Sequence, residues 1–232
     1  LIVGLLLALA GGAAWWLRQA HWPIEQVRID GTVVHADRAR IKEMVSAHAQ
    51  AGFFGMDLDA LRADLRALPW VRDASLRRVW PHTLDATIHE HEAAARWNDD
   101  QLLSRRGAVF APDGIEVEGV PVLSGPEGHG PAMLQRLQRF NEVLAPLGLK
   151  IAALTQDARR GWRMEFANGV ALKLGQTEHL QARLERFAAV WPRALTDKAA
   201  TIAAVDMRYP NGFAVDWRGE DKATGARDGG DA

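Results

Sequence analysis

The stretch that begins at Asp57 constrains the fold more than any other part of this chain. Four leucines recur there at helical spacing, at Leu58, Leu61, Leu65 and Leu68. The spacing predicts a helix with one apolar face and with Asp and Arg side chains on the other. Pro69 ends this helix, because proline forces the residue before it out of the α region.

Two strands are predicted directly after this helix. Ala74 and Leu76 share one face of the first strand, and Trp80-Pro81-His82-Thr83 forms the turn that follows. In the second strand three apolar residues alternate with polar ones, at Leu84, Ala86 and Ile88. Since neither a helix nor a hairpin can bury its apolar side alone, we expect the leucine face to pack on one face of the hairpin.

The residues before this stretch complete a small domain. An alternating run around Val27 predicts a strand that Gly31 closes. Asp37 can cap a helix, and the inner face of that helix is formed by Ile41, Met44, Val45 and His48. Gly52–Gly55 is expected to be a loop. The order over residues 24–91 is therefore strand, helix, helix, strand, strand, which predicts an α+β layer with two helices on one face of three strands.

The first segment of the chain, Leu1–Leu17, carries no charge. As a helix it would span about 26 Å, slightly less than the hydrocarbon core of about 30 Å. Aromatic residues stand where the membrane interface would be, at Trp15, Trp16 and Trp22. We expect residues 1–20 to form a retained transmembrane anchor that exports the rest of the chain. The alternative is a cleavable signal peptide, for which Ala8-Leu9-Ala10 is an acceptable cleavage site.

The second half of the chain, residues 92–217, is predicted to be a mostly antiparallel β domain with at least two helices. Three short strands come first and are separated by turn residues, at Ala94–Trp97, Leu102–Leu103 and Val109–Ala111. A loop rich in Gly and Pro, residues 125–131, then introduces a helix that ends at Gly148. Its inward-facing residues are Leu134, Leu137, Phe140, Leu144 and Leu147.

The remaining segments predict two hairpins, a helix and a tail. Asn168-Gly169 lies between two alternating runs and is typical of a hairpin turn. A helix that Pro192 stops carries Leu180, Leu184, Phe187 and Trp191 on one face. The last strands, Ile202–Tyr209 and Phe213–Trp217, are joined by Pro210-Asn211-Gly212. Residues 218–232 combine charge and glycine without periodicity, which predicts a disordered tail.

Composition and motifs argue against nucleic-acid binding and against catalysis. The net charge is −1 with a pI near 6.8, and the chain has no cysteine, which excludes disulfides and thiolate chemistry.

His89 and His91 could bind a metal from one face of a strand, but no third ligand is suggested. Residues 128–131 resemble an anion-binding helix start without a phosphate motif, and Asp57 with Asp59 is typical of a helix cap. No serine has the context of a nucleophile. The sequence predicts no catalytic residue, metal site or cofactor.

Five segments carry motifs that, in this order, resemble a known family. They are Val27–Gly31, Leu68–Val71 with Ala74, Arg78–Pro81, Glu90–Asn98, and Val205–Tyr209 with Gly212 and Trp217. Together they resemble the FtsQ/DivIB family of bacterial cell-division proteins, over residues 24–217. Ala93 departs from the family pattern, which commonly has proline there, and this bears on the rigidity of the joint between the two domains.

The resemblance implies both a fold and a function. It implies that residues 21–91 form a POTRA (polypeptide-transport-associated) domain and that residues 92–217 form the β domain of the family. It also implies a non-enzymatic divisome scaffold, held in the inner membrane by a single type II span, with most of the chain in the periplasm at the division septum. Its expected partners are the single-span proteins FtsB and FtsL and the proteins of septal peptidoglycan synthesis.

The resemblance also places the contact with FtsB at the final hairpin. An uncovered final strand offers unpaired N–H and C=O groups, which form a template for strand addition by another chain. Tyr209 and Trp217 would then be anchors, and Arg208 with Arg159 or Arg160 would face acidic residues of the partner. Alternatively, Tyr209 and Trp217 only pack within the hairpin and core. The expected partner-binding residues are Arg159, Arg160, Arg208, Tyr209, Asn211, Gly212, Phe213, Val215 and Trp217.

Two other classes of protein remain as alternatives. A POTRA-bearing assembly or secretion component of the envelope usually carries several POTRA domains or a long β-barrel, and neither is predicted here. An exported cell-wall hydrolase requires an activated nucleophile or a metal, and the motifs provide neither.

Overall fold

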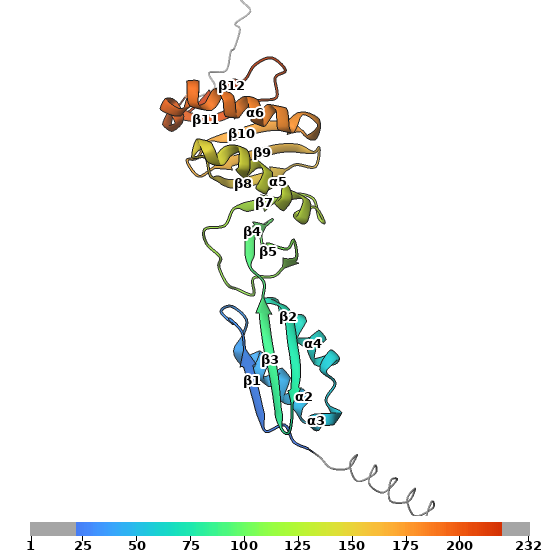
Figure 1. Ribbon diagram of the computed structural model, residues 1–232. Helices are drawn as coiled ribbons and strands as arrows, with labels where there is room; N and C mark the ends of the chain where they lie inside the picture. Colours follow the sequence, from blue (N-terminus) through green and yellow to red (C-terminus); the bar gives the residue numbers. More distant parts are fainter. Residues whose placement is uncertain (1–21, 220–232) are drawn as a thin grey trace, which may run out of the picture. The chain divides into compact units, whose positions relative to one another are not determined.

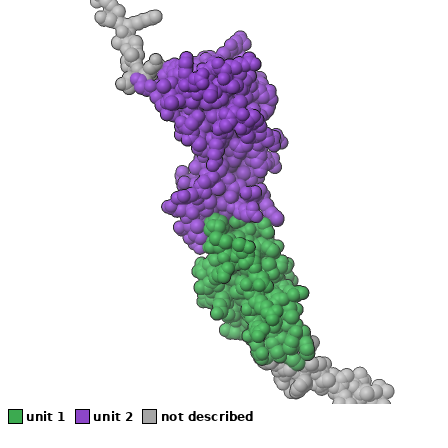
Figure 2. Space-filling view, turned by 60° about the vertical axis from the view of Figure 1, so that its left-hand side comes forward, with its two compact units in different colours: residues 1–91 green, residues 92–232 purple. Residues whose placement is uncertain are grey.

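The computed structural model describes residues 22–219. The chain divides into two compact units, residues 1–91 and residues 92–232 (Figure 2). The predicted anchor lies outside the described residues, as does all but the start of the predicted tail. None of the helices within residues 22–219 is both long enough and apolar enough to cross a membrane.

The first unit has the predicted order of strands and helices, with one added turn. In chain order its elements are β1 (Gln26–Asp30), α2 (Arg38–Ala49), α3 (Gly52–Gly55), α4 (Leu58–Arg66), β2 (Val71–Val79) and β3 (Thr83–Glu90). The sheet order is β1-β3-β2, with β1 parallel to β3 and β2 antiparallel to it (Figure 1). The two long helices begin as predicted, because the carboxylates of Asp37 and Asp57 each accept two backbone N–H groups of the first turn.

The core of this unit joins the leucine face of α4 to the hairpin. Leu61 and Leu65 have no exposed surface, and neither do Leu84 and Ala86 of β3. Ile41 and Val45 of α2 complete the same cluster. The amphipathic pattern that begins at Asp57 therefore forms the contact that it predicts.

The segment Gly52–Gly55 is not the loop expected from its glycines. It forms one helical turn, α3, in which the N–H of Met56 donates to the carbonyl of Gly52 at 3.0 Å. The N–H of Phe53 donates to the carbonyl of Trp22 at 2.8 Å, and the Phe53 ring is buried. The buried Phe53 ring and the backbone bond from Phe53 to Trp22 thus fix a segment that its two glycines alone would leave irregular.

The second unit is built on one nine-stranded sheet in the order β12-β11-β10-β9-β8-β7-β4-β5-β6. Its strands are β4 (Ala93–Trp97), β5 (Gln101–Ser104), β6 (Val109–Phe110), β7 (Val122–Ser124), β8 (Ile151–Gln156), β9 (Gly161–Phe166), β10 (Ala171–Gln176), β11 (Ile202–Asp206) and β12 (Ala214–Trp217). Parallel pairs join β4 to β7, β7 to β8 and β10 to β11. The sheet is therefore mixed, and it is less antiparallel than the sequence predicts.

Two helices cover one face of this sheet, α5 (Gly130–Leu144) and α6 (Leu180–Val190) (Figure 1). Their apolar faces meet alternate residues of β9 and β10, together with Ile151 and Leu154 of β8, in one large core. Phe166 of β9 and Phe187 of α6 stack at its centre, with ring centroids 5.8 Å apart. The predicted inward residues of both helices are buried, except that Leu147 lies in a 3-10 turn and is only partly buried.

The sequence reading missed or misplaced several segments of the second unit. It did not predict β7 or β8. Pro192 does not stop the helical path, since a π-helical turn, Trp191–Leu195, and a 3-10 segment, Thr196–Thr201, continue it as far as β11. The last two strands are shorter than predicted: β11 ends at Asp206 and β12 begins at Ala214, so Tyr209 and Phe213 lie in the loop between them.

Candidate partner-binding edge of the larger sheet

Strand β12 is one end of the nine-stranded sheet. It pairs antiparallel with β11, and Val215 lies opposite Val205. Just after the strand, the N–H of Arg218 donates to the carbonyl of Thr201 at 2.7 Å, towards the sheet. Because N–H groups alternate in direction along a strand, we infer that the N–H groups of Val215 and Trp217 point away from β11. Within residues 22–219, no strand pairs with this outer edge.

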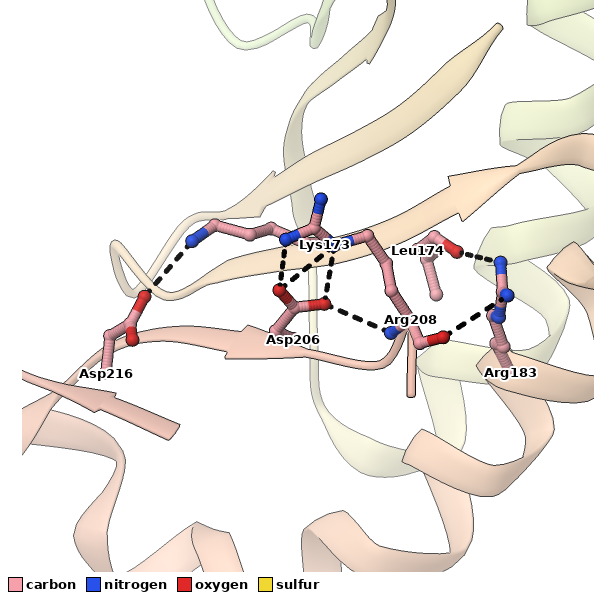
Figure 3. Close-up of polar contacts among 6 residues, drawn as sticks. All are labelled: Lys173, Leu174, Arg183, Asp206, Arg208 and Asp216. Atoms are coloured by element: carbon pink, nitrogen blue, oxygen red, sulfur yellow. Dashed lines mark hydrogen bonds and ion pairs between the residues drawn. The ribbon is translucent and has the colours of Figure 1, made fainter. Parts of the chain in front are cut away.

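The side chains of β12 divide between the two faces of the sheet. Val215 and Trp217 are partly buried and pack against the large core. Asp216 lies on the face without helices, where its carboxylate is 3.1 Å from Nζ of Lys173 (Figure 3). Trp217 therefore packs against the core from the outermost strand of the sheet.

The loop between β11 and β12 presents aromatic side chains to solvent. Tyr209 is 54% exposed and Phe213 is 37% exposed. They line a shallow depression of about 440 Å³ together with Pro210, Asn211, Gly212 and Ala214. The alternative in which Tyr209 is a core residue is excluded by its exposure.

Two arginines of α6 hold this loop from inside. Arg186 donates to the carbonyls of Met207, Tyr209 and Pro210 at 3.2, 3.0 and 2.5 Å. Arg183 donates to the carbonyl of Leu174 at 2.7 Å and to that of Arg208 at 3.4 Å (Figure 3). Because the guanidinium groups satisfy loop carbonyls that have no strand partner, they fix the backbone that carries Tyr209.

Arg208 is not a freely available cation, because it is paired within the chain. Its guanidinium donates from Nη2 to Asp206 at 2.6 Å and from Nε to both oxygens of that carboxylate (Figure 3). Its backbone N–H donates to the same carboxylate at 3.0 Å. The Arg208 side chain is nevertheless 60% exposed, whereas that of Asp206 is 9% exposed. Arg208 is therefore the solvent-exposed member of the ion pair, and Asp206 is the buried member.

The charge of this pair follows from its environment. Burial raises the pKa of Asp206, but the hydrogen bonds from Arg208 and the charges of Arg208 and Lys173 outweigh it, so the pKa is lowered from its ordinary value of 3.8. The hydrogen bond and charge of Asp206 in turn raise the pKa of Arg208. The pair is therefore fully ionised at neutral pH.

Arg159 and Arg160 lie in the turn between β8 and β9, where both are exposed. Asp157 organises this turn by accepting the N–H groups of Arg159 and Gly161 at 2.9 and 2.7 Å. Gly161 pairs with the end of β10, and β10 runs parallel to β11. The turn therefore lies at the same end of the sheet as Tyr209, two strands further from the edge.

The sequence indicated the exposed members of this site but not the residues that support them. Aromatic and turn residues at the end of a hairpin predict exposure, so Tyr209 and Gly212 could be found from their neighbours alone. Arg183 and Arg186 occupy the polar positions of an amphipathic helix, which carry no signal that relates them to a loop more than twenty residues later. Among residues 22–219, no group of three or more His, Asp or Glu side chains lies close enough together to hold a metal ion.

Comparison with protein families matches both units. Residues 22–91 match the model of the POTRA domain, FtsQ-type. Residues 95–208 match the model of the cell division protein FtsQ/DivIB, C-terminal.

Individual relatives match most of the chain. It is 37% identical over 222 residues to the cell division protein FtsQ of Thioalkalivibrio sp. (strain K90mix), covering 94% of this chain and 92% of the relative. It is 33% identical over 215 residues to the same protein of Burkholderia pseudomallei (strain K96243), covering 91% and 86%. The match to that of Coxiella burnetii (strain RSA 493 / Nine Mile phase I) is 34% over 198 residues, covering 84% and 81%.

Proposed function

Because this chain belongs to the FtsQ/DivIB family of cell-division proteins, we propose that it is a non-enzymatic scaffold of the bacterial divisome. In this role it links FtsB-type and FtsL-type single-span proteins to septal wall synthesis. A fluorescent fusion should collect at the septum of dividing cells. A fusion spread evenly over the envelope during division would contradict the proposal.

The proposal includes a single membrane span formed by residues 1–20, with both compact units in the periplasm. The uncharged run Leu1–Leu17 and the tryptophans at and after its end, Trp15, Trp16 and Trp22, support this span. Deletion of residues 1–20 should release a folded fragment from the envelope fraction. A mature N-terminus directly after Ala10 would instead identify a cleaved signal peptide.

The observation that carries the proposal is the outer edge of β12, with which no strand of residues 22–219 pairs. A partner segment in extended conformation would bond to the N–H groups of Val215 and Trp217, and would continue the sheet by one strand. Backbone bonds provide affinity in such a mode, while side-chain contacts at the end of the strand provide specificity.

The loop beside β12 supplies those side chains. Tyr209 and Phe213 offer exposed aromatic surface, and residues 210–212 shape the depression between them. Arg208, Arg159 and Arg160 lie at the same end of the sheet and would attract acidic residues of the partner. Since Arg183 and Arg186 hold the loop before the partner arrives, little ordering would be required on binding.

Substitution of Tyr209 by Ala tests this assignment. Affinity for an FtsB-type periplasmic segment should fall by about 1–4 kcal/mol if Tyr209 is a hot spot. The melting temperature should not change, because the side chain is more than half exposed. Isothermal titration of the full chain in detergent with the purified segment measures both affinities.

Val109→Ala is the matched control. Val109 is 42% exposed and lies on β6, at the opposite end of the strand order. This variant should bind as tightly as the original chain. Unchanged affinity in Tyr209→Ala, at unchanged stability, would show that the proposed site is wrong.

A further inference from the structure

The first unit exposes two large aromatic side chains at one of its ends. Phe54 of α3 is 66% exposed, and Trp80, in the turn between β2 and β3, is 70% exposed. Exposure of this degree is unusual for Phe and Trp, which bury large areas when a partner surface exists. The POTRA core does not need either side chain, since the cluster of buried residues in this unit contains neither of them.

Both side chains lie where the described chain begins. The Trp22 ring packs edge-on to Phe54, with centroids 6.4 Å apart, and stacks on His82, with centroids 5.9 Å apart. The carbonyl of Trp22 accepts the N–H of Phe53, and the carbonyl of His82 accepts the N–H of Glu25 at 2.9 Å. Trp22 thus contacts both α3 and the β2–β3 turn. Figure 1 shows α3 at the end of the unit where β1 begins. We call Trp22, Phe54 and Trp80 the aromatic end.

The apolar segment of the sequence ends close to this aromatic end. Leu17 is the last residue of the uncharged run, five residues before Trp22. A fully extended chain of five residues reaches at most about 18 Å. The headgroup region adds about 5–8 Å on each side of the hydrocarbon core. If Leu1–Leu17 crosses the bilayer, the aromatic end is therefore tethered within reach of the same membrane surface.

We propose that Phe54 and Trp80 insert into the lipid headgroup region, so that the POTRA unit rests on the membrane through α3 and the β2–β3 turn. The proposal rests on the membrane span proposed above. Tryptophan prefers this interfacial depth, because its ring is apolar and its indole N–H can bond to headgroups. Phenylalanine adds apolar surface that can be buried at the boundary between headgroups and acyl chains. Glu25 is exposed at the same end, which is compatible with headgroup depth but not with the hydrocarbon core.

The chain itself offers a direct test, because it contains no cysteine. A single Gln50→Cys, at an exposed position two residues before α3, carries a nitroxide label beside the aromatic end without altering it. Val34→Cys is the control, since Val34 is 68% exposed and its N–H bonds to Glu90 at the far end of β3. The full chain is reconstituted into vesicles of phosphatidylethanolamine and phosphatidylglycerol. Collisions of each label with lipid-soluble oxygen and with a water-soluble nickel chelate are then measured.

The expected ratio of oxygen to nickel collisions is several-fold higher at position 50 than at position 34. A second background, Phe54→Ser with Trp80→Ser, should return position 50 to the value of position 34 without lowering the melting temperature. Equal ratios at both positions in the unsubstituted background would overturn the inference, and so would a ratio at position 50 that does not respond to the two serines. Flotation of the vesicles separates the two proposals: a chain that floats but shows equal ratios retains its anchor and loses only the interfacial contact, whereas a chain that does not float loses both.

Discussion

Arg186 is the residue on which the exposed loop of the larger sheet most depends. Its guanidinium donates hydrogen bonds to three carbonyls of the loop backbone, those of Met207, Tyr209 and Pro210. Sequence reasoning could not find this contact, because an arginine on the polar face of a helix is normally solvated and carries no mark of its partner. Asp206 and Arg208, by contrast, are only two residues apart in the sequence. They pair because β11 ends at Asp206, and the sequence did not predict this end of the strand.

The ion pair of Asp206 and Arg208 predicts a specific pH dependence. The pKa of Asp206 is lower in the folded chain than its ordinary value of 3.8. The unfolded chain therefore binds a proton more readily, and the pair stabilises the fold fully above about pH 4–5 and progressively less as the pH falls through the folded pKa. Asp206→Asn should consequently destabilise the second unit at pH 7, and the difference from the original chain should shrink as the pH falls below 3.8.

Calorimetry of both chains from pH 7 to pH 2 measures this difference, provided that the transition of the second unit is followed. Asp216→Asn is the matched control, because the Asp216 side chain is 58% exposed in its pair with Lys173. An exposed pair contributes about 1 kcal/mol or less. A difference between Asp206→Asn and the original chain that stays constant down to the lowest pH would contradict the argument.

At the scale of elements, the sequence indicated most clearly the hairpins in which alternating strands flank a recognisable turn. The β2–β3 and β9–β10 hairpins each have alternating strands on both sides of a recognisable turn, so pattern and pairing agree. Strand β7 has only three residues and pairs in parallel with β4 and β8, which its own sequence cannot indicate. Strand β8 reads IAALTQ, in which apolar and small residues do not alternate cleanly. Short length and parallel pairing thus explain why β7 was missed, and weak alternation explains why β8 was missed.

Helix α4 provides a prediction about the stability of the first unit. Leu65 has no exposed surface and packs between α4 and the hairpin. Leu65→Ala should lower the free energy of unfolding by about 2–5 kcal/mol, because it removes buried methyl groups and leaves a cavity. Thermal unfolding monitored by calorimetry measures the effect. The exposed neighbour Arg66→Ala should change stability by about 0.5 kcal/mol or less, and equal effects of the two substitutions would show that the face of α4 is wrongly assigned.

Strand β12 provides a prediction about how a partner is held. Val215→Pro removes an N–H group that points away from β11, so it should abolish strand addition. Val215→Ala is the matched control: it shortens the same side chain but retains the N–H group. Binding of an FtsB-type segment should be lost in the proline variant and only weakened in the alanine variant. Similar affinities of the two variants would mean that the outward N–H group of residue 215 has no part in binding.

At the scale of the whole molecule, residues 22–219 form two sheets, each of which is covered by helices on one face. The small sheet ends at β1 and β2, and the large sheet ends at β6 and β12. Any of these end strands is in principle open to another chain. The account singles out β12 because an exposed aromatic loop, held in place by α6, lies directly beside it. The same reasoning assigns the aromatic end of the first unit to lipid and not to a partner strand, since its exposed groups are side chains in turns.

The central claim is therefore that a division partner adds a strand to β12, and amide hydrogen exchange on the full chain tests it most directly. Exchange is measured for the chain alone and with a saturating FtsB-type periplasmic segment. The account predicts that the amides of Val215 and Trp217 exchange rapidly in the free chain and become strongly protected in the complex, while those of β1, β2 and β6 keep their rates. Binding that protects one of those other strands and leaves Val215 and Trp217 unchanged would contradict it.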